Sequence, residues 1–151
     1  MPNIAAKWIA AGLLSLCLGL PTGAKANDAK ELVIRALTEA MIERDVTAID
    51  RYWAEDYIQH NPMAPSGREP IRGLIANAPK GATYEMGMVI AEGDLVAVHG
   101  RITGIGPKPL IAIDIYRVED GMIAEHWDVI QEEVLETASG NPMFEPAQPM
   151  Q

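Results

Sequence analysis

The stretch PLIAIDIYRVEDGMIAEHWDVIQEE, residues 109–133, decides the fold of this chain. Apolar and polar residues alternate through both of its halves, which is the period of a half-buried β-strand. Between the halves stands Glu119-Asp120-Gly121, and an Asp-Gly pair favours the tight turn of a β-hairpin. The stretch therefore predicts two long antiparallel strands.

The same period of two fills residues 83–104, TYEMGMVIAEGDLVAVHGRITG, with a turn at 92–94. Upstream of these strands the apolar residues recur instead at three- and four-residue intervals. This spacing predicts helices over 27–44, 46–57 and 68–79, the last two separated by a Pro-rich loop. Three helices followed by four antiparallel strands predict an α+β fold, with the helices on one face of a curled sheet.

The first 26 residues have the three regions of a secretory signal peptide. Lys7 supplies a positive charge without an acidic residue, residues 8–20 are apolar, and Ala24 and Ala26 have the spacing that a signal peptidase accepts. The apolar run is shorter than the roughly 20 residues of a membrane-spanning helix. A buried N-terminal helix is the alternative interpretation. We expect cleavage after Ala26 and a periplasmic or secreted protein.

Cleavage would leave a single domain over 27–138 and a Pro-rich tail over 139–151. It would remove the only cysteine, Cys17, and with it any disulfide, cysteine-ligated cofactor or cysteine nucleophile. The net charge of −9 would become −11, because ten basic residues would remain against 21 acidic ones. Such a chain lacks the clustered cations that bind phosphates. We therefore expect no nucleic-acid partner and, after cleavage, no membrane partner.

Three segments together resemble a known family: YIQHNP (57–62), VHGRITG (98–104) and DIYRVEDGMIAEHWDVIQ (114–131). They are similar to the SnoaL-like polyketide cyclases of the nuclear-transport-factor-2-like superfamily, over essentially the whole chain after residue 26. The resemblance implies a cone-shaped barrel, in which a curved sheet wraps around helices and encloses one apolar pocket. It also implies a homodimer formed through the outer sheet face, and chemistry at a proton next to a carbonyl group without metal or cofactor.

The residues of the last strand do not by themselves show which of its two faces points into the pocket. His126, Asp128 and Ile130 share one face, whereas Trp127 and Val129 on the other would also make a good core face. The resemblance favours His126 and Asp128 toward the pocket, because it implies an acidic residue on this strand as general acid or base. A carboxyl group in an apolar pocket has a raised pKa, which suits it to proton transfer at a carbon next to a carbonyl.

We therefore expect a small hydrophobic substrate that contains a carbonyl group, and either an aldol-type cyclisation or an isomerisation. The first candidate for general acid or base is Asp128 and the second is Asp114. The remaining candidates are His126 and His99 in catalysis, and His60, Asn61, Trp53, Tyr116 and Trp127 in substrate binding. For His99 a half-buried structural role is as well supported, and the aromatic residues could equally be plain core.

Two other classes of function stay open at this stage. A periplasmic binding module could use the same pocket to hold a hydrophobic ligand without turnover, and an interaction protein could depend mainly on its dimer surface. A metal site is a further alternative, because His60, His99 and His126 could converge with a carboxylate. No two histidines are one helical turn apart, so the sequence predicts neither a metal nor another cofactor.

Overall fold

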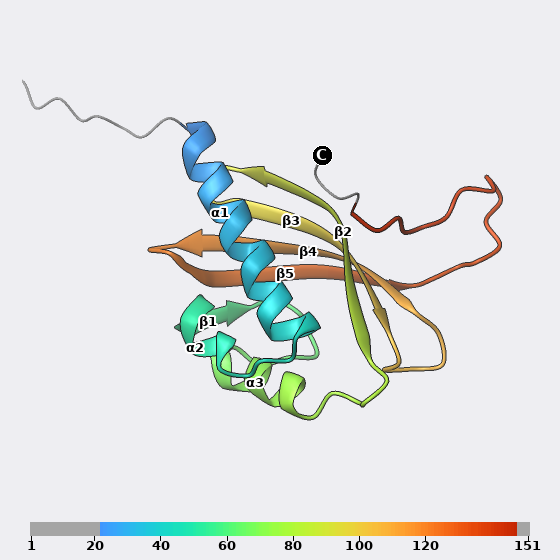
Figure 1. Cartoon of the computed structure of the whole chain (residues 1–151), viewed down its shortest axis with the longest axis horizontal. Helices are drawn as coiled ribbons and strands as arrows, with labels where there is room; N and C mark the ends of the chain where they lie inside the picture. Colours follow the sequence, from blue (N-terminus) through green and yellow to red (C-terminus); the bar gives the residue numbers. More distant parts are fainter. Residues whose placement is uncertain (1–21, 148–151) are drawn as a thin grey trace, which may run out of the picture.

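The computed structural model describes residues 22–147 of the 151-residue chain (Figure 1). The helices are α1 (Thr22–Leu37), which continues as the π-helical turn η1 (Thr38–Ile42), α2 (Ala48–Tyr52) and α3 (Arg68–Ala76). The strands are β1 (Trp53–Gln59), β2 (Thr83–Glu92), β3 (Leu95–Thr103), β4 (Leu110–Glu119) and β5 (Met122–Glu132).

Most of the predicted signal peptide, residues 1–21, lies outside the described residues, and residues 22–26 form the start of α1. No helix among the described residues is long and apolar enough to cross a membrane.

The five strands form one sheet in the order β1-β5-β4-β3-β2, with the four long strands antiparallel to their neighbours. The predicted α+β class is confirmed, with two corrections. The sheet is open rather than a closed barrel, and it has a fifth strand, β1, which runs parallel to β5. Residues 53–57 were expected in a helix, but α2 ends at Tyr52, because pairing with the edge of β5 determines the conformation of this segment.

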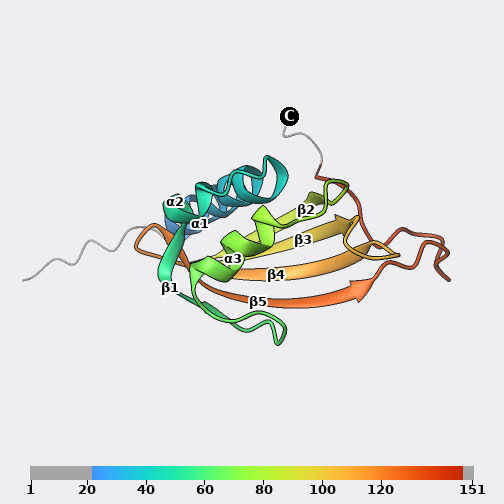
Figure 2. The same ribbon diagram turned by 90° about the horizontal axis from the view of Figure 1, so that it is seen from below.

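Figure 2 shows α1, α2 and α3 on one face of the curved sheet, while the opposite face has no helix over it. Alternation along the strands directs one set of side chains into the space under the helices. Val96 and Val98 of β3 are completely buried there against Val33 and Leu37 of α1. The core is therefore confined to the helix-covered face of the sheet.

The predicted hairpin turn at 119–121 is confirmed. Asp120 and Gly121 have φ angles of +50° and +76°, the positive values that a two-residue turn of type I′ requires at both central positions. The turn pairs Glu119 with Met122, and a β-bulge between Arg117 and Val118 then shifts the register of the last hairpin by one residue. Asp114 lies opposite Asp128, and Tyr116 opposite His126.

The segment after β5 returns to the sheet. The backbone N–H of Ala147 donates to the carbonyl oxygen of Met86, 3.0 Å away, and Phe144 is buried beside Gly87 and His99. A side chain at Gly87 would begin 2.6 Å from the carbonyl oxygen of Glu145, so the absence of a Cβ at this position permits the contact.

Candidate functional site

A cavity of about 760 Å³ lies between the helix-covered face of the sheet and the helices. Its lining is largely apolar and includes Leu37 of α1, Ile71 of α3 and Ile102 of β3. The polar groups gather on one wall, where β4, β5 and the end of β1 meet. Such a cavity, apolar with a few convergent polar groups, is typical of a small-molecule site.

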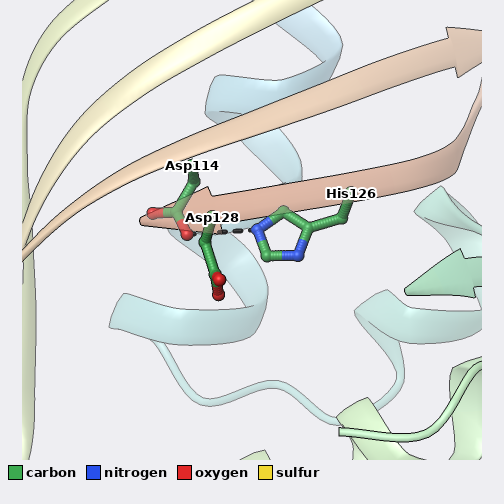
Figure 3. Close-up of side chains that lie close together, drawn as sticks. All are labelled: Asp114, His126 and Asp128. Atoms are coloured by element: carbon green, nitrogen blue, oxygen red, sulfur yellow. Dashed lines mark hydrogen bonds and ion pairs between the residues drawn. The ribbon is translucent and has the colours of Figure 1, made fainter. Parts of the chain in front are cut away.

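Three side chains from two neighbouring strands form the centre of the polar wall: Asp114, His126 and Asp128 (Figure 3). The His126 Nε2 atom lies 3.1 Å from Asp114 Oδ1, and one polar atom from each of the three residues lies within 4.8 Å of the other two. Asp114 and His126 are buried, whereas Asp128 is partly exposed to the cavity. The alternation of β5 directs His126 and Asp128 to the same side.

Gln59, at the end of β1, determines which nitrogen of His126 carries a proton. The backbone N–H of Asn61 donates to Gln59 Oε1 over 3.0 Å, so this atom is the acceptor end of the amide. The same Oε1 atom lies 2.8 Å from His126 Nδ1. Because a carbonyl oxygen can only accept, Nδ1 must carry hydrogen, and the ring nitrogen facing Asp114 is Nε2.

The 3.1 Å separation of His126 Nε2 and Asp114 Oδ1 is that of a hydrogen bond, in which the two groups share one proton. The Tyr84 hydroxyl donates a second, longer hydrogen bond of 3.3 Å to the other oxygen of Asp114. Gly100 permits this contact, since a Cβ there would lie 2.9 Å from the Tyr84 hydroxyl oxygen.

Asp128 accepts a hydrogen bond from the loop after β1. The backbone N–H of Met63 donates to Asn61 Oδ1 over 2.7 Å, which identifies Asn61 Nδ2 as the donor end of that amide. Asn61 Nδ2 then donates to Asp128 Oδ2 over 2.6 Å. Asp128 is thus held as an acceptor through one oxygen, and its other oxygen accepts no hydrogen bond from residues 22–147.

Two buried tyrosines, Tyr57 and Tyr116, also line the cavity. Burial raises the pKa of both phenols, and the charges of Asp114 and Asp128 raise it further, so both hydroxyls stay protonated donors. Within the described part of the chain neither hydroxyl donates to a protein group. Trp53 Nε1–H is near the Tyr57 hydroxyl but is buried without a hydrogen bond of normal geometry.

The opposite end of the cavity holds its only cationic side chain among the described residues, Arg44. Its guanidinium donates to the carbonyl oxygens of Pro79 and Ala82. The guanidinium is therefore already bonded to the backbone. Because Asp128 also lines the cavity, the cavity is better suited to an uncharged ligand than to an anion.

Asp114, His126 and Asp128 are also close enough together to hold a metal ion. One imidazole and two carboxylates would suit a divalent cation such as Zn²⁺. Each group already has a protein partner, however: Gln59 and Asp114 for His126, and Asn61 for Asp128. The sequence prediction that no metal is bound stays a prediction, to be tested by chelation.

Six of the nine residues predicted for the site line the cavity: Asp128, His126, Asp114, Asn61, Trp53 and Tyr116. The other three do not, which corrects their expected placement. His60 and Trp127 stack on each other on the opposite side of β5, and His99 contacts Phe144 on the outer sheet face. Their backbone positions place them there, because each alternates with a residue that faces inward.

Sequence reasoning missed three polar residues of the wall: Tyr57, Gln59 and Tyr84. Tyr57 and Gln59 alternate with the outward Ile58, as residues of a strand do, and Asn61 continues the spacing. Treating residues 53–61 as a strand rather than a helix and loop would have revealed them. For Tyr84 the contact with Asp114 joins residues 30 positions apart, and no local signal predicts it.

The family model of the SnoaL-like domain matches residues 34–126. Among solved structures, the chain is similar to a nuclear-transport-factor-2-like protein of unknown function from Burkholderia xenovorans, with 20% identity over 78% of this chain and 93% of that one, and a TM-score of 0.63. No functionally curated protein matches.

Two further similar structures are provisionally assigned enzymes. One is a ketosteroid isomerase from Kribbella flavida, with 18% identity over 83% of this chain and 93% of that one, and a TM-score of 0.63. The other is a polyketide cyclase from Bacillus cereus, with 23% identity over 71% and 76%, and a TM-score of 0.61. At these identities the likeness shows a shared fold.

Proposed function

Because the chain belongs to the SnoaL-like domain family of the nuclear-transport-factor-2-like superfamily, we propose that it binds a small hydrophobic carbonyl compound and moves a proton at the carbon next to the carbonyl. No metal or cofactor takes part in the proposed reaction. The observation that carries the proposal is the position of Asp128. Its second carboxylate oxygen accepts no hydrogen bond from the described residues, and it lines an apolar cavity together with Tyr57 and Tyr116, whose hydroxyls have no acceptor among those residues.

The proposed first step is proton abstraction. Asp128 takes a proton from the carbon next to the carbonyl, the C–H bond breaks, and its electron pair forms a carbon–carbon double bond while the carbonyl oxygen gains negative charge. The Tyr57 and Tyr116 hydroxyls donate hydrogen bonds to that oxygen. Hydrogen-bond donors fixed in a water-poor site stabilise developing charge strongly.

The second step depends on the substrate. Return of the proton from Asp128 to a different carbon isomerises a double bond. Attack of the enolate carbon on a second carbonyl forms a carbon–carbon bond and closes a ring, and the new alkoxide then needs a proton. The hydrogen bond between His126 and Asp114 can supply this proton, and Asp128, within 4.8 Å of both, then returns the proton it took to the pair, which restores the site. Neither route needs an oxidant or a reductant.

The sheet register suggests how a ligand lies in the cavity. Asp114, Ala112 and Leu110 point to the same face of β4, so the cavity extends about 13 Å along the strand from Asp114 to Leu110. Apolar side chains, including the exposed Leu74 and Ile105, line the rest of the cavity. We infer that the carbonyl end of the ligand lies at Asp128 and its apolar body extends toward Leu110.

The proposed chemistry is tested by deuterium exchange into a panel of small ketones and β-dicarbonyl compounds. Asp128→Asn keeps the shape of the side chain and removes the base, so exchange should fall by about 10²-fold or more while ligand affinity survives. Asp114→Asn leaves Asp128 in place and should lower exchange less. Loss of exchange in Asp114→Asn alone would make Asp114 the base.

A non-catalytic binding module is the alternative function. It predicts no exchange by the wild type, together with tight binding of a hydrophobic ligand. In that case Asp128→Asn should leave affinity unchanged or improve it, because burying a neutral amide costs less than burying a charge. Chelating agents should have no effect in either case. Loss of exchange on chelation, restored by added Zn²⁺, would instead assign the Asp114–His126–Asp128 group to a metal.

A further inference from the structure

The segment Gln59-His60-Asn61 contacts β5 on both of its faces. Gln59 and Asn61 point into the cavity and bond to His126 and Asp128. His60, between them, points to the outer face. The backbone N–H of His60 also donates to the carbonyl oxygen of His126 over 2.9 Å. Side chains alternate along an extended chain, so neighbouring residues of this segment point to opposite faces of the sheet. The segment therefore links the cavity wall to a group of residues on the outer face.

On the outer face, His60 packs into what we call the outer cluster: His60, Trp127, Glu125 and Arg117. The imidazole stacks on the Trp127 indole, with ring centroids 4.7 Å apart and planes 5° from parallel. His60 Nε2 lies 2.7 Å from Glu125 Oε1, and Arg117 Nε lies 2.8 Å from Glu125 Oε2. The bonds from His60 and then Arg117 lower the pKa of Glu125, so it is a carboxylate that accepts from both.

Asn61 is also held within its own loop, since its backbone N–H donates to Gln59 Oε1 and the N–H groups of Met63 and Ala64 donate to its Oδ1 and carbonyl oxygen. Strand β1 is an edge strand, and its pairing with β5 ends at Gln59. Beyond it, hydrogen bonds from Gly67 N–H to the Tyr57 carbonyl and from Gln59 N–H to Ser66 Oγ also join the loop to β1. The His60 contacts are the side-chain anchor nearest to Asn61 on the far side of β5.

We propose that His60 is a positioning residue: by stacking on Trp127 and bonding to Glu125 outside the cavity, it holds the Asn61 amide on Asp128 inside it. The site thus extends through the edge of the sheet to residues that no ligand in the cavity can touch. His60 was expected from the sequence to bind substrate; the geometry points to an indirect role instead. The effect on rate rests on the proposed function, but the effect on Asn61 does not.

The test is the side-chain amide signal of Asn61 in ¹⁵N-labelled protein, identified by its absence in Asn61→Ala. In His60→Ala, and separately in Glu125→Ala, this signal should move toward the position of a free amide. Its hydrogen exchange should accelerate about tenfold, as expected when a charge-assisted hydrogen bond is lost. Val129→Ala is the matched control, since Val129 shares the outer face of β5 but is not part of the outer cluster.

An unchanged Asn61 signal in both His60→Ala and Glu125→Ala would overturn the proposal. A similar change in Val129→Ala would also overturn it, because any damage to the outer face would then have the same effect. If the wild type catalyses deuterium exchange, His60→Ala should lower kcat about tenfold with little change in KM. Absence of exchange in the wild type would contradict the proposed function while leaving the amide measurement decisive for His60.

Discussion

At the scale of single residues, two backbone N–H groups determine how the polar side chains of the site are oriented. Those of Asn61 and Met63 orient the Gln59 and Asn61 amides, and the amides in turn give His126 a proton on Nδ1 and make Asp128 an acceptor. Polar groups held in this way need no reorganisation when charge develops on a ligand.

The tyrosine donors are a prediction at this scale. Tyr57→Phe and Tyr116→Phe each remove one hydroxyl without changing the ring, and each should lower the rate of ketone deuterium exchange by about 10²-fold, the usual effect of losing one oxyanion donor. Stopped-exchange measurements by mass spectrometry would check this. Tyr52→Phe is the matched control, because the Tyr52 hydroxyl donates to Glu39 away from the cavity. Equal rates in all three variants would remove the tyrosines from the mechanism.

At the scale of elements, β1 and α3 supply walls of the cavity that the four long strands alone would lack. β1 extends the sheet beyond β5 and supplies Tyr57 and Gln59 to the polar wall. α3 covers the cavity and carries Leu74, which lines it although the side chain is 63% exposed. An exposed leucine contributes little to folding. We therefore interpret Leu74 as a contact for the apolar body of the ligand.

This interpretation predicts a selective loss of affinity. Leu74→Ser should weaken binding of a long-chain methyl ketone about fivefold, the equivalent of about 1 kcal/mol of apolar burial, and should leave a short-chain ketone unaffected. Titration followed by tryptophan fluorescence measures both. Leu135→Ser is the control, since Leu135 is 76% exposed and does not line the cavity. An equal loss for short and long ketones would contradict the proposed orientation of the ligand.

At the scale of the whole molecule, the outer face of the sheet has no helix over it (Figure 2), and it carries several exposed apolar side chains. Ile113 and Val129 lie opposite each other in the β4–β5 pair. Ile113 is 43% exposed and Val129 is 74% exposed. Ile90 on β2 is exposed as well. A contiguous exposed apolar patch of this kind marks an interface in soluble proteins.

We accordingly predict a homodimer formed through this face. A twofold interface brings the same patch of both subunits together, so one substitution acts twice. Val129→Asp should therefore convert the dimer to a monomer, whereas Leu135→Asp, outside the sheet, should leave it intact. Light scattering at micromolar concentration distinguishes the two states. A monomeric wild type would contradict the prediction.

Export is also a property of the whole chain, and it stays a prediction. Cleavage after Ala26 would remove the first five residues of α1, but the buried Ala29, Val33 and Ala36 of that helix would remain. The processed protein should therefore keep its core. Mass spectrometry of the periplasmic protein should give Asn27 as the N-terminus. Soluble cytoplasmic protein that begins with Met1 would show that no export occurs.

The sequence by itself determined the features that depend on local periodicity and turn chemistry. The period of two predicts β2 to β5, and the Asp120-Gly121 pair predicts the turn between the last two strands. With the family resemblance, it also favoured the face of β5 on which His126 and Asp128 lie. These features follow from neighbours in the chain, so a reader of the sequence can find them.

Only the tertiary structure decided how β1 is used. Residues 53–57 have a pattern compatible with a helix, and they become a strand because the edge of β5 offers backbone hydrogen bonds. That pairing turns Tyr57, Gln59 and Asn61 inward and His60 outward onto Trp127. The partners are more than 60 residues apart, and contacts over such distances depend on packing rather than on any local preference of the chain.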